Sequence, residues 1–479
     1  MKFSLNAPEE SLNRIHSVAL RILAELGIRL DQPEMRERLA GLGCRVSGEA
    51  VCIPPELAEM ALRAVPPSFR LYGRDDSQGV RVGGDGPFLC TNTGILPYVY
   101  DFETGEVRSS VREDVETTTR VLDALSEIDI VYVSLLDATE VPGHLITLTD
   151  LAATLANTTK PLVGPGATTG AEARAIIAMA AAVRGGDRER LAAEPPCALF
   201  VAPITPLKFP TDAVDALIEV AHAGLPLMAL TNPVMGATAP YSIAGTVALA
   251  HAEILATIVM AYAVRPGLPI LNFSAPTVAD MRTISSTSGG PETGLMRALA
   301  VSLARSLGIP AWGHGHTSST RLDEQASDEK SINQLLIAQA GPSLLGGLGG
   351  LANVTLTSYE TLVLDNERFA ALRRVMRGVV VDDEHLALDV LADMMRGEEV
   401  IRHDHTLNML HGDEVWRPRL ARRQGLVGGA PDAKSARERA REEARRMMEQ
   451  HVVAPLPAAV QAEMDEIIAA YDRDHGQKA

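Results

Sequence analysis

The stretch that decides the fold is "CALFVAPITPLKFPTDAVDALIEVAHAGLPLMALTNP", residues 197–233. It contains a short apolar run at 197–203, a longer segment at 211–223 and a second apolar run at 226–233. The short runs are typical of strands that are buried on both faces, and the longer segment is long enough for a helix. A strand, a helix and a strand in this order predict two parallel strands joined by a crossover helix.

The alternation of short apolar runs with longer helical segments continues on both sides of this unit. Predicted strands lie at 129–135, 161–166, 197–203, 226–233, 269–276, 309–315 and 343–351. Predicted helices lie at 113–126, 170–185, 211–223, 243–264, 291–307 and 326–340. With an eighth strand at 354–359 or within 144–156, the pattern favours an α/β fold of the (β/α)8 TIM-barrel type. An open doubly wound sheet is less favoured, because no glycine-rich dinucleotide turn follows the first strand.

Three regions of the chain differ in their pattern. Residues 1–112 combine short helices with a hairpin and predict an N-terminal α/β extension. Residues 113–358 hold the repeated units of a TIM-barrel catalytic core. Residues 359–479 are mostly helical and densely charged between 421 and 447. They predict a helical C-terminal region that completes and covers the barrel.

Composition and charge limit the possible functions. The chain has a net charge of −17, which argues against a nucleic-acid partner, because little would offset phosphate repulsion. Its four cysteines match no zinc spacing and indicate no disulfide framework. The start lacks the apolar core of a signal peptide, and the longest apolar segment carries His251 and Glu253 in its middle. We therefore expect a cytoplasmic protein with reduced thiols and no membrane span.

In a TIM barrel, ligands bind where the strands end and their loops begin. The strand in "GIPAWGHGH" (308–316) places Trp312, His314 and His316 on one face, because strand side chains alternate. Phe273 lies on the opposite strand face from its neighbours and is expected in the core. The polar and aromatic residues expected near the mouth are Tyr98, Asn232, Tyr241, Asn272, Ser274, Trp312, His314, His316, Asp323 and Gln325.

Three interpretations of the 308–316 strand stay open on the residues alone. A His-x-His pair can bind one metal ion, but the further histidines and the carboxylate of hydrolytic barrels do not follow at clear spacing. Aromatic faces suit a quaternary ammonium group, which cannot donate a hydrogen bond. In the third interpretation, Trp312 packs in the core and His314 is a polar neighbour. The run "GGLGG" (346–350) is no phosphate loop, and its glycines would let something bulky approach the backbone.

Several longer motifs resemble those of one known family. They are "DFETGEVR" (101–108), "NPVMGATAPYSIAGTVALAHAEILA" (232–256), "SGGPE" (288–292), "YETLVLDNE" (359–367), "GVVVDDEHLALDV" (378–390) and "HDHT" (403–406). Together they resemble the trimethylamine:corrinoid methyltransferase family over nearly the whole chain.

The resemblance implies a TIM barrel that moves a methyl group from a methylated amine to the cobalt(I) of a corrinoid, carried by a partner protein or supplied free. Archaeal trimethylamine enzymes of the family use pyrrolysine, which this sequence lacks. The chain is therefore similar to the non-pyrrolysine branch, which acts on quaternary amines such as glycine betaine, carnitine or proline betaine. A quaternary amine leaves as a neutral tertiary amine without a proton, so positioning and desolvation would be the enzyme's part.

On this interpretation each candidate residue has an expected role. His314 and Asp323 would be catalytic. The substrate would contact Tyr98, Asn232, Tyr241, Asn272, Trp312, His316 and Gln325, and the corrinoid would lie against Gly346, Gly347 and Gly349. We expect no metal ion of the protein's own, and a homo-oligomer. The alternatives are a metal-dependent TIM-barrel hydrolase that uses His314 and His316, and a non-catalytic binder of betaine-like ligands.

Overall fold

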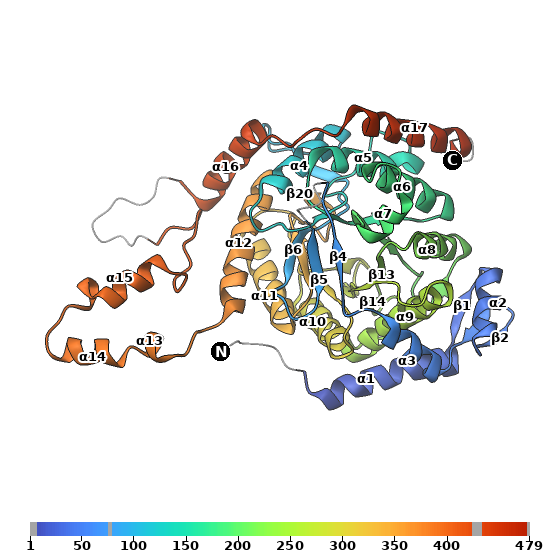
Figure 1. The fold of residues 1–479 in the computed structure, drawn as a ribbon, viewed down its shortest axis with the longest axis horizontal. Coiled ribbons are helices and arrows are strands. Elements are labelled where there is room, and N and C mark those ends of the chain that lie inside the picture. The colour runs from blue at the N-terminus through green and yellow to red at the C-terminus, as the bar shows by residue number, and fades with distance from the viewer. Residues whose placement is uncertain (1–6, 75–78, 424–433, 477–479) are drawn as a thin grey trace.

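Eight short parallel strands form the centre of the computed structural model, which describes residues 7–74, 79–423 and 434–476 (Figure 1). In chain order they are β6 (Leu89–Asn92), β9 (Val131–Tyr132), β10 (Leu162–Gly166), β11 (Cys197–Val201), β13 (Leu227–Thr231), β15 (Ile270–Ser274), β18 (Trp312–His314) and β19 (Leu344–Leu348). The strands are almost entirely buried, as parallel strands covered by helices must be. The predicted TIM barrel is confirmed.

Two parallel sheets close on each other to make the barrel. Five strands pair in the order β15-β13-β11-β10-β9, and three pair in the order β18-β19-β6. A parallel bridge between Asn272 and Ala311 joins β15 to β18. Between β6 and β9, the Asn92 amide accepts from Tyr132 N at 2.8 Å and donates to Tyr132 O at 3.1 Å. A side chain thus supplies hydrogen bonds between these two strands.

A helix follows each barrel strand and covers the outside of the barrel (Figure 1). These helices are α4 (Arg112–Ala124), α5 (Ile146–Asn157), α6 (Gly170–Val183), α8 (Thr211–Ala223), α9 (Ile243–Val264), α10 (Pro291–Ser306), α11 (Glu324–Ala340) and α12 (Tyr359–Arg377). Local sequence encodes their ends. Thr169 and Ser358 accept a backbone N–H as N-caps, and Gly224 ends α8 in the left-handed region. The six predicted helices are confirmed.

Short strands, one short helix and one helical turn lie in the loops between the barrel strands and their helices. They are β7 (Tyr98–Tyr100), β8 (Val107–Ser109), η3 (Gly143–Leu145), α7 (Arg188–Ala193), β12 (Lys208–Phe209), β14 (Val234–Met235), β16 (Thr277–Ala279), β17 (Ser286–Thr287) and β20 (Leu356–Thr357).

The first barrel strand, β6, was not among the predicted strands. The segment 144–156 is helical, and 354–359 contributes only β20, which pairs with β7 outside the barrel. The predicted barrel boundary at residue 113 is therefore wrong, since the barrel begins with β6. Its sequence, Leu-Cys-Thr-Asn, has no apolar run, because half of the strand is polar. The helix α12 completes the eighth strand–helix unit.

The N-terminal region packs against one side and one end of the barrel. Its elements are α1 (Glu9–Arg21), η1 (Ile22–Leu26), β1 (Ile28–Leu30), α2 (Pro33–Gly41), β2 (Arg45–Ser47), β3 (Ala50–Cys52), α3 (Pro55–Ala64), β4 (Ser68–Leu71) and β5 (Val80–Gly83). The β4–β5 hairpin packs Phe69, Leu71 and Val82 in one apolar cluster with Ile130 and Leu344, which lie where barrel strands begin. The hairpin therefore closes the amino-terminal end of the barrel and leaves the other end for a site.

The C-terminal region first leaves the barrel and then returns to it (Figure 1). An arm of residues 379–415, with α13 (Asp383–Leu386), α14 (Leu388–Met395), η4 (Val400–Arg402) and α15 (Asp404–His411), projects beyond α12. The last helices, α16 (Ala436–Gln450) and α17 (Ala458–His475), pack on α12, α4, α5 and α6.

Helix α9 lies in the core of the protein. Of the helices in the described ranges, it alone is long and apolar enough to cross a membrane, but 83% of its apolar window is buried inside the protein. Its Glu253 accepts hydrogen bonds from Thr205 Oγ1 at 3.0 Å, from Leu207 N at 2.8 Å and from Thr231 Oγ1. Burial raises the pKa of this carboxyl. The acid in the middle of the helix is thus matched by donors on the barrel side.

Candidate active site

A cavity of about 300 Å³ lies where the barrel strands end. It is lined by Thr93, Gly94, Tyr132, Leu230, Asn232, Phe273, Ala275, Thr277, Ser286, Ser288, Arg297, Trp312, His314, His316, Gly347, Asn353 and Val354. Larger hollows, of about 500 and 600 Å³, lie along α12 and the arm, away from the strand ends. The barrel cavity is the candidate active site, because strand ends from six positions around the barrel converge on it.

Aromatic rings form one wall of the cavity. The rings of Phe273 and Trp312 are stacked with centroids 4.0 Å apart, and Tyr132 lies tilted 5.3 Å from Trp312. His314 meets Phe273 edge-on at 5.0 Å. Trp312 and His314 are 2% and 7% exposed. This wall offers ring faces in a site that excludes most water, which suits a methylated cation.

Two histidines share a short hydrogen bond in the cavity wall. His314 Nδ1 lies 2.5 Å from His316 Nε2 and 3.3 Å from Arg297 Nη1. Because a guanidinium can only donate, His314 Nδ1 must accept, and His314 therefore carries its proton on Nε2. Burial, together with the Arg297 charge, holds the pKa of both histidines well below the usual value. Both rings are neutral at physiological pH.

Arg297, on α10, supplies the formal charge in the cavity wall. The side chain is 2% exposed. Its Nε donates to Pro276 O at 3.1 Å, and its Nη1 donates to His314 O at 2.9 Å. Burial lowers its pKa to about 9, which leaves the guanidinium charged at neutral pH. No Asp or Glu is among the lining residues. The cavity wall therefore offers no carboxylate to a cation.

Half-buried polar side chains hold the loops of the cavity mouth in place. Asn353 Oδ1 accepts from Ser288 N at 2.9 Å and from Ser318 Oγ at 2.7 Å. Glu329 of α11 accepts from Ser318 N at 2.8 Å. Asn353 and Val354 have positive φ angles of 55° and 68°. This conformation is strained for Val354, because its side chain is β-branched. These contacts join loops from three strand–helix units into one rim.

The structure brings five of the predicted site residues together in the cavity wall: Asn232, Trp312, His314, His316 and Gly347. The two predicted tyrosines lie outside it. Tyr98 is 45% exposed on β7, and Tyr241 is 66% exposed beside Gly236. The two tyrosines that the sequence analysis placed near the mouth therefore do not line the cavity.

Asn272 and Phe273 exchange the faces that the sequence analysis gave them. Phe273 points into the barrel interior and lines the cavity, whereas Asn272 and Ser274 are buried but do not line it. The prediction that Asn272 contacts substrate is not supported. Phe273 is buried in a core cluster, as predicted, and it also lines the cavity. Alternation correctly separated the two faces, but the direction of each face depends on barrel closure.

Asp323 and Gln325 belong to the start of α11 rather than to the cavity. Asp323 is the N-cap of the helix and accepts from Ala326 N at 3.0 Å and from Ser319 Oγ at 2.9 Å. The backbone hydrogen bond from Ala326 lowers the pKa of this carboxyl. Gln325 is exposed and donates to Glu329 at 2.9 Å. Capping accounts for Asp323, so the structure does not support a catalytic role.

Close packing explains the glycines predicted to lie against a corrinoid. A Cβ on Gly346 would lie 2.4 Å from Trp312 Nε1, and a Cβ on Gly349 would lie 2.6 Å from Leu362. Gly347 does line the cavity, but its φ is 105° and a Cβ there would meet Gly315 O at 2.1 Å. These glycines let strands and the Trp312 ring approach one another, and this packing accounts for them without a corrinoid.

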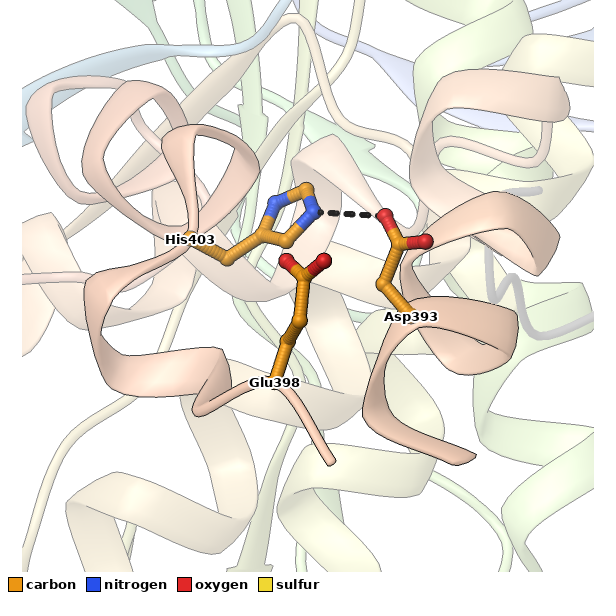
Figure 2. A group of neighbouring side chains, drawn as sticks. All are labelled: Asp393, Glu398 and His403. Atoms are coloured by element: carbon orange, nitrogen blue, oxygen red, sulfur yellow. Dashed lines mark hydrogen bonds and ion pairs between the residues drawn. The ribbon is translucent and has the colours of Figure 1, made fainter. Parts of the chain in front are cut away.

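One group of three potential metal ligands occurs in the described ranges, and it lies in the arm: Asp393, Glu398 and His403 (Figure 2). His403 Nδ1 accepts from His405 N at 3.1 Å, so its proton sits on Nε2, which faces Asp393 at 3.3 Å. Asp393 is also paired with Arg396. Hydrogen bonds and an ion pair account for the group. His314 and His316 belong to no such group, and the guanidinium beside His314 Nδ1 disfavours a dication there.

Comparison with known proteins agrees with this barrel fold. Residues 4–476 match the model of the trimethylamine methyltransferase (MTTB) family. The chain belongs to this family. It is 30% identical over 474 residues to trimethylamine methyltransferase MttB of Desulfitobacterium hafniense strain DSM 10664 / DCB-2, covering 98% of this chain and 94% of the relative. The family resemblance of the sequence motifs is confirmed.

Two further proteins bear on the family assignment. Glycine betaine methyltransferase of Desulfitobacterium hafniense strain Y51 is 26% identical over 472 residues, with 98% of each chain covered. The crystal structure of Methanosarcina barkeri monomethylamine methyltransferase (MtmB) matches with a TM-score of 0.53 at 14% identity, covering 95% of this chain and 96% of that one. This structural likeness concerns the fold.

Sequence reasoning missed several residues that line the cavity of this family member. Thr93 follows β6, which has no apolar run, and Tyr132 lies in the predicted strand 129–135 but was not assigned to the site. Arg297 had a usable signal, because it lies inside the apolar helical run "LMRALAV" (295–301) just after the "SGGPE" motif. An arginine inside an apolar helix is rarely buried without a purpose.

Proposed function

We propose that the protein transfers a methyl group from a quaternary amine, such as glycine betaine, to the cobalt(I) of a corrinoid. One observation carries this proposal. The cavity combines the aromatic wall of Tyr132, Phe273 and Trp312 with histidines that are neutral at physiological pH, and no acid lines it. The site can therefore bind a methylated nitrogen but offers no good proton donor to a leaving group.

A quaternary amine is the methylated amine that suits such a site. The reduced corrinoid supplies the nucleophile that takes the methyl group. The electron pair of the broken C–N bond stays on the nitrogen of a neutral tertiary amine. No proton is needed at any atom of this leaving group. Trimethylamine itself is a poorer donor, and pyrrolysine, which its archaeal enzymes use, is absent from this chain.

The residues of the cavity would act by binding, orienting and excluding water. The ring faces of Trp312 and Phe273 attract the positive charge on the quaternary nitrogen. The rest of the cavity wall stabilises that charge poorly. The buried position of His314 and His316 keeps the site dry and fixes the wall through their mutual hydrogen bond. We therefore assign His314 to the binding wall in place of the catalytic role expected from the sequence.

The family assignment supports the proposal at a coarser level. Relatives along the full chain bear the names of methyltransferases for trimethylamine and for glycine betaine. The corrinoid partner protein, the cytoplasmic location and the homo-oligomer belong to the proposal. Self-association has support in the arm, where Leu388, Met395 and Ile401 are 78%, 88% and 73% exposed. Light scattering of the purified protein measures the oligomeric state.

The test is a methyl-transfer assay on the full chain. Purified protein is mixed with chemically reduced cobalamin and glycine betaine, carnitine, proline betaine, choline or trimethylamine, and methylcobalamin is followed by its absorption spectrum. We expect turnover with a quaternary amine and a stoichiometric demethylated product by mass spectrometry. Turnover with trimethylamine alone would contradict the proposal, as would stoichiometric bound zinc together with hydrolase activity.

A further inference from the structure

The arm of residues 379–415 has almost no core of its own. Of its large apolar side chains, Val390 alone is buried, whereas Leu388, Met395 and Ile401 are 78%, 88% and 73% exposed. The arm projects away from the barrel, so the barrel does not cover these side chains (Figure 1). Exposure of this much apolar surface is unfavourable unless another surface covers it, which makes the arm a candidate interaction surface.

An apolar hollow of about 600 Å³ lies between the helices of the arm. Its wall includes Val390, Leu391 and Met394 from α14, and Met409 and Leu410 from α15. Leu388, two residues before Val390, is not among the lining residues. One arm therefore carries both an empty apolar hollow and, next to it, an exposed side chain of the kind that fills such a hollow.

A second hollow, of about 500 Å³, adjoins the apolar one and is basic. The linings of the two hollows share Val415 and Arg417. Arginines outnumber carboxylates in the lining of the second hollow. Some of this charge is neutralised within the chain, as in the pair of Arg377 with Asp413 at 2.9 Å. An apolar surface thus continues directly into a surface with excess positive charge.

Two arginines of this basic hollow carry the excess charge. Arg417 donates to Leu410 O, and Arg419 acts on Glu443 of α16 only from beyond ion-pair distance. Both arginines are exposed, and neither has an ion-pair partner among the residues that the structure describes. Their charge is available to a carboxylate from another molecule.

Matching negative charge lies at the start of the arm. Residues 382–389 read "DDEHLALD", so Leu388 lies in an acidic segment. The side chains of Asp383, Glu384 and Asp389 are exposed and form no ion pair within the described ranges of the chain. The same arm therefore presents a leucine flanked by acids and an apolar hollow flanked by arginines.

We propose that the arm is the interface between two copies of this chain, with the acidic segment 382–389 of each copy seated on the hollows of the other. Leu388 enters the apolar hollow, and the acids beside it face Arg417 and Arg419. A twofold axis presents the same surface on both copies, so an arm that carries both complementary faces matches itself. The inference rests on the homo-oligomer of the proposed function and names the surface that forms it.

The mass of the full chain in solution tests the inference. Size-exclusion chromatography with light scattering gives the assembly state, and sedimentation equilibrium gives the dissociation constant. Leu388→Asp should weaken self-association at least about 30-fold, because a carboxylate replaces a buried apolar contact of the interface. Val452→Asp, at a position that is 85% exposed but outside the arm, is the matched control and should assemble as the wild type does. Circular dichroism checks that both variants are folded.

A charge exchange tests the pairing itself. Asp383→Lys/Asp389→Lys and Arg417→Glu/Arg419→Glu each place like charges against each other, so each double variant alone should associate more weakly than the wild type. In an equimolar mixture, lysines of one copy meet glutamates of the other, and native arginines meet native acids. The mixture should regain assembly close to that of the wild type, a rescue that misfolded variants do not give. Salt should weaken assembly of the wild type, because these charges are exposed before association.

A wild type that is monomeric throughout the concentration series would overturn the inference. So would unchanged assembly in Leu388→Asp, or a mixture of the two charge variants that stays as weakly associated as each variant alone. The two proposals can fail separately. Methyl transfer by a monomeric wild type would keep the proposed reaction and remove the arm interface. Assembly through the arm, with no methyl transfer to reduced cobalamin, would keep the interface and remove the proposed reaction.

Discussion

Two buried cations on neighbouring helices, Lys330 of α11 and Arg297 of α10, differ in how their charge is compensated. Lys330 is 1% exposed, and its Nζ lies 2.6 Å from Asp365 Oδ2. Asp365 also pairs with Arg368 and accepts from Gly349 N at 2.8 Å. Arg297 is as deeply buried but meets only neutral acceptors. The fold itself neutralises the charge of Lys330, whereas the charge of Arg297 is left for a ligand to neutralise.

This difference separates a structural cation from a binding cation. Burial alone does not distinguish them, because both side chains are almost inaccessible. The presence of an anion within the fold does. Lys330 and Asp365 tie α11 and α12 to the end of β19, so removing Lys330 leaves the buried Asp365 carboxylate with Arg368 as its one ion-pair partner in the described part of the chain. Removing Arg297 leaves no such charge.

The largest expected effect is on stability, in Lys330→Met. We expect the free energy of unfolding to fall by about 3–5 kcal/mol, because Asp365 loses its buried partner. In Arg297→Met the loss should be at most about 2 kcal/mol, since two carbonyls lose a donor but a desolvated charge is also removed. Urea denaturation followed by circular dichroism measures both. Equal losses would show that the two cations are both structural.

The neutral histidine pair predicts a pH dependence of stability. In the unfolded chain His314 and His316 take up protons below about pH 6.5, but in the folded protein their pKa values are lowered. The unfolded state therefore binds more protons, so stability is fully present above pH 6.5 and falls as the pH drops. Each histidine contributes a slope of about 1.4 kcal/mol per pH unit.

The double variant His314→Gln/His316→Gln isolates the pH dependence that is due to these two histidines. All other titrating groups are present in both proteins, so their contributions cancel in the difference. Urea denaturation at pH 7, 6 and 5 gives the difference in the free energy of unfolding between wild type and variant. That difference should shrink steadily as the pH falls below 6.5. A difference independent of pH would mean that the pair takes up protons equally in the folded and unfolded states.

A smaller effect is expected when the aromatic wall is changed. Phe273→Leu keeps apolar bulk but removes a ring face, so betaine binding should weaken about 5- to 30-fold, the equivalent of ~1–2 kcal/mol of cation–π attraction. Phe209→Leu, a buried phenylalanine outside the cavity, is the matched control. It should lower stability and leave the dissociation constant unchanged. Similar binding losses in both variants would point to general destabilisation.

The smallest effects are expected at Tyr241 and Gln325, which the sequence placed at the mouth. Both are exposed and outside the cavity wall. Tyr241→Ala and Gln325→Ala should change the betaine dissociation constant by less than about twofold, since surface substitutions act weakly. Calorimetry with the same betaine measures this. A tenfold loss in either variant would show that these residues close over a bound ligand.

Much of the fold could be predicted from local pattern. Apolar runs such as 161–166 and 197–203 correspond to β10 and β11, and helix ends carry their own caps and glycines. The strand β6 could not be found this way, because half of it is polar and the hydrogen bonds of its Asn92 go to Tyr132, which is distant in the chain. Barrel strands that contribute to a site tend to be less apolar than those that do not.

The candidate site was predicted only in part. The His-x-His strand and its tryptophan were found, because alternation puts them on one face and closure turned that face inward. On β15 the same rule chose the wrong face, so Asn272 and Phe273 exchanged places. Asp323 was selected for its chemistry, but a carboxylate at a helix start is often a cap.

By itself, the sequence determined the order of the strand–helix units, the family and the presence of a His-x-His strand, because these depend on residues close together in the chain. Only the tertiary structure decided which strand faces look into the cavity and which buried cation has an anion beside it. Those properties arise when strand ends as far apart in the chain as Thr93 and Asn353 meet at one end of the barrel. Burial and charge compensation are set by neighbours in space, which local periodicity does not record.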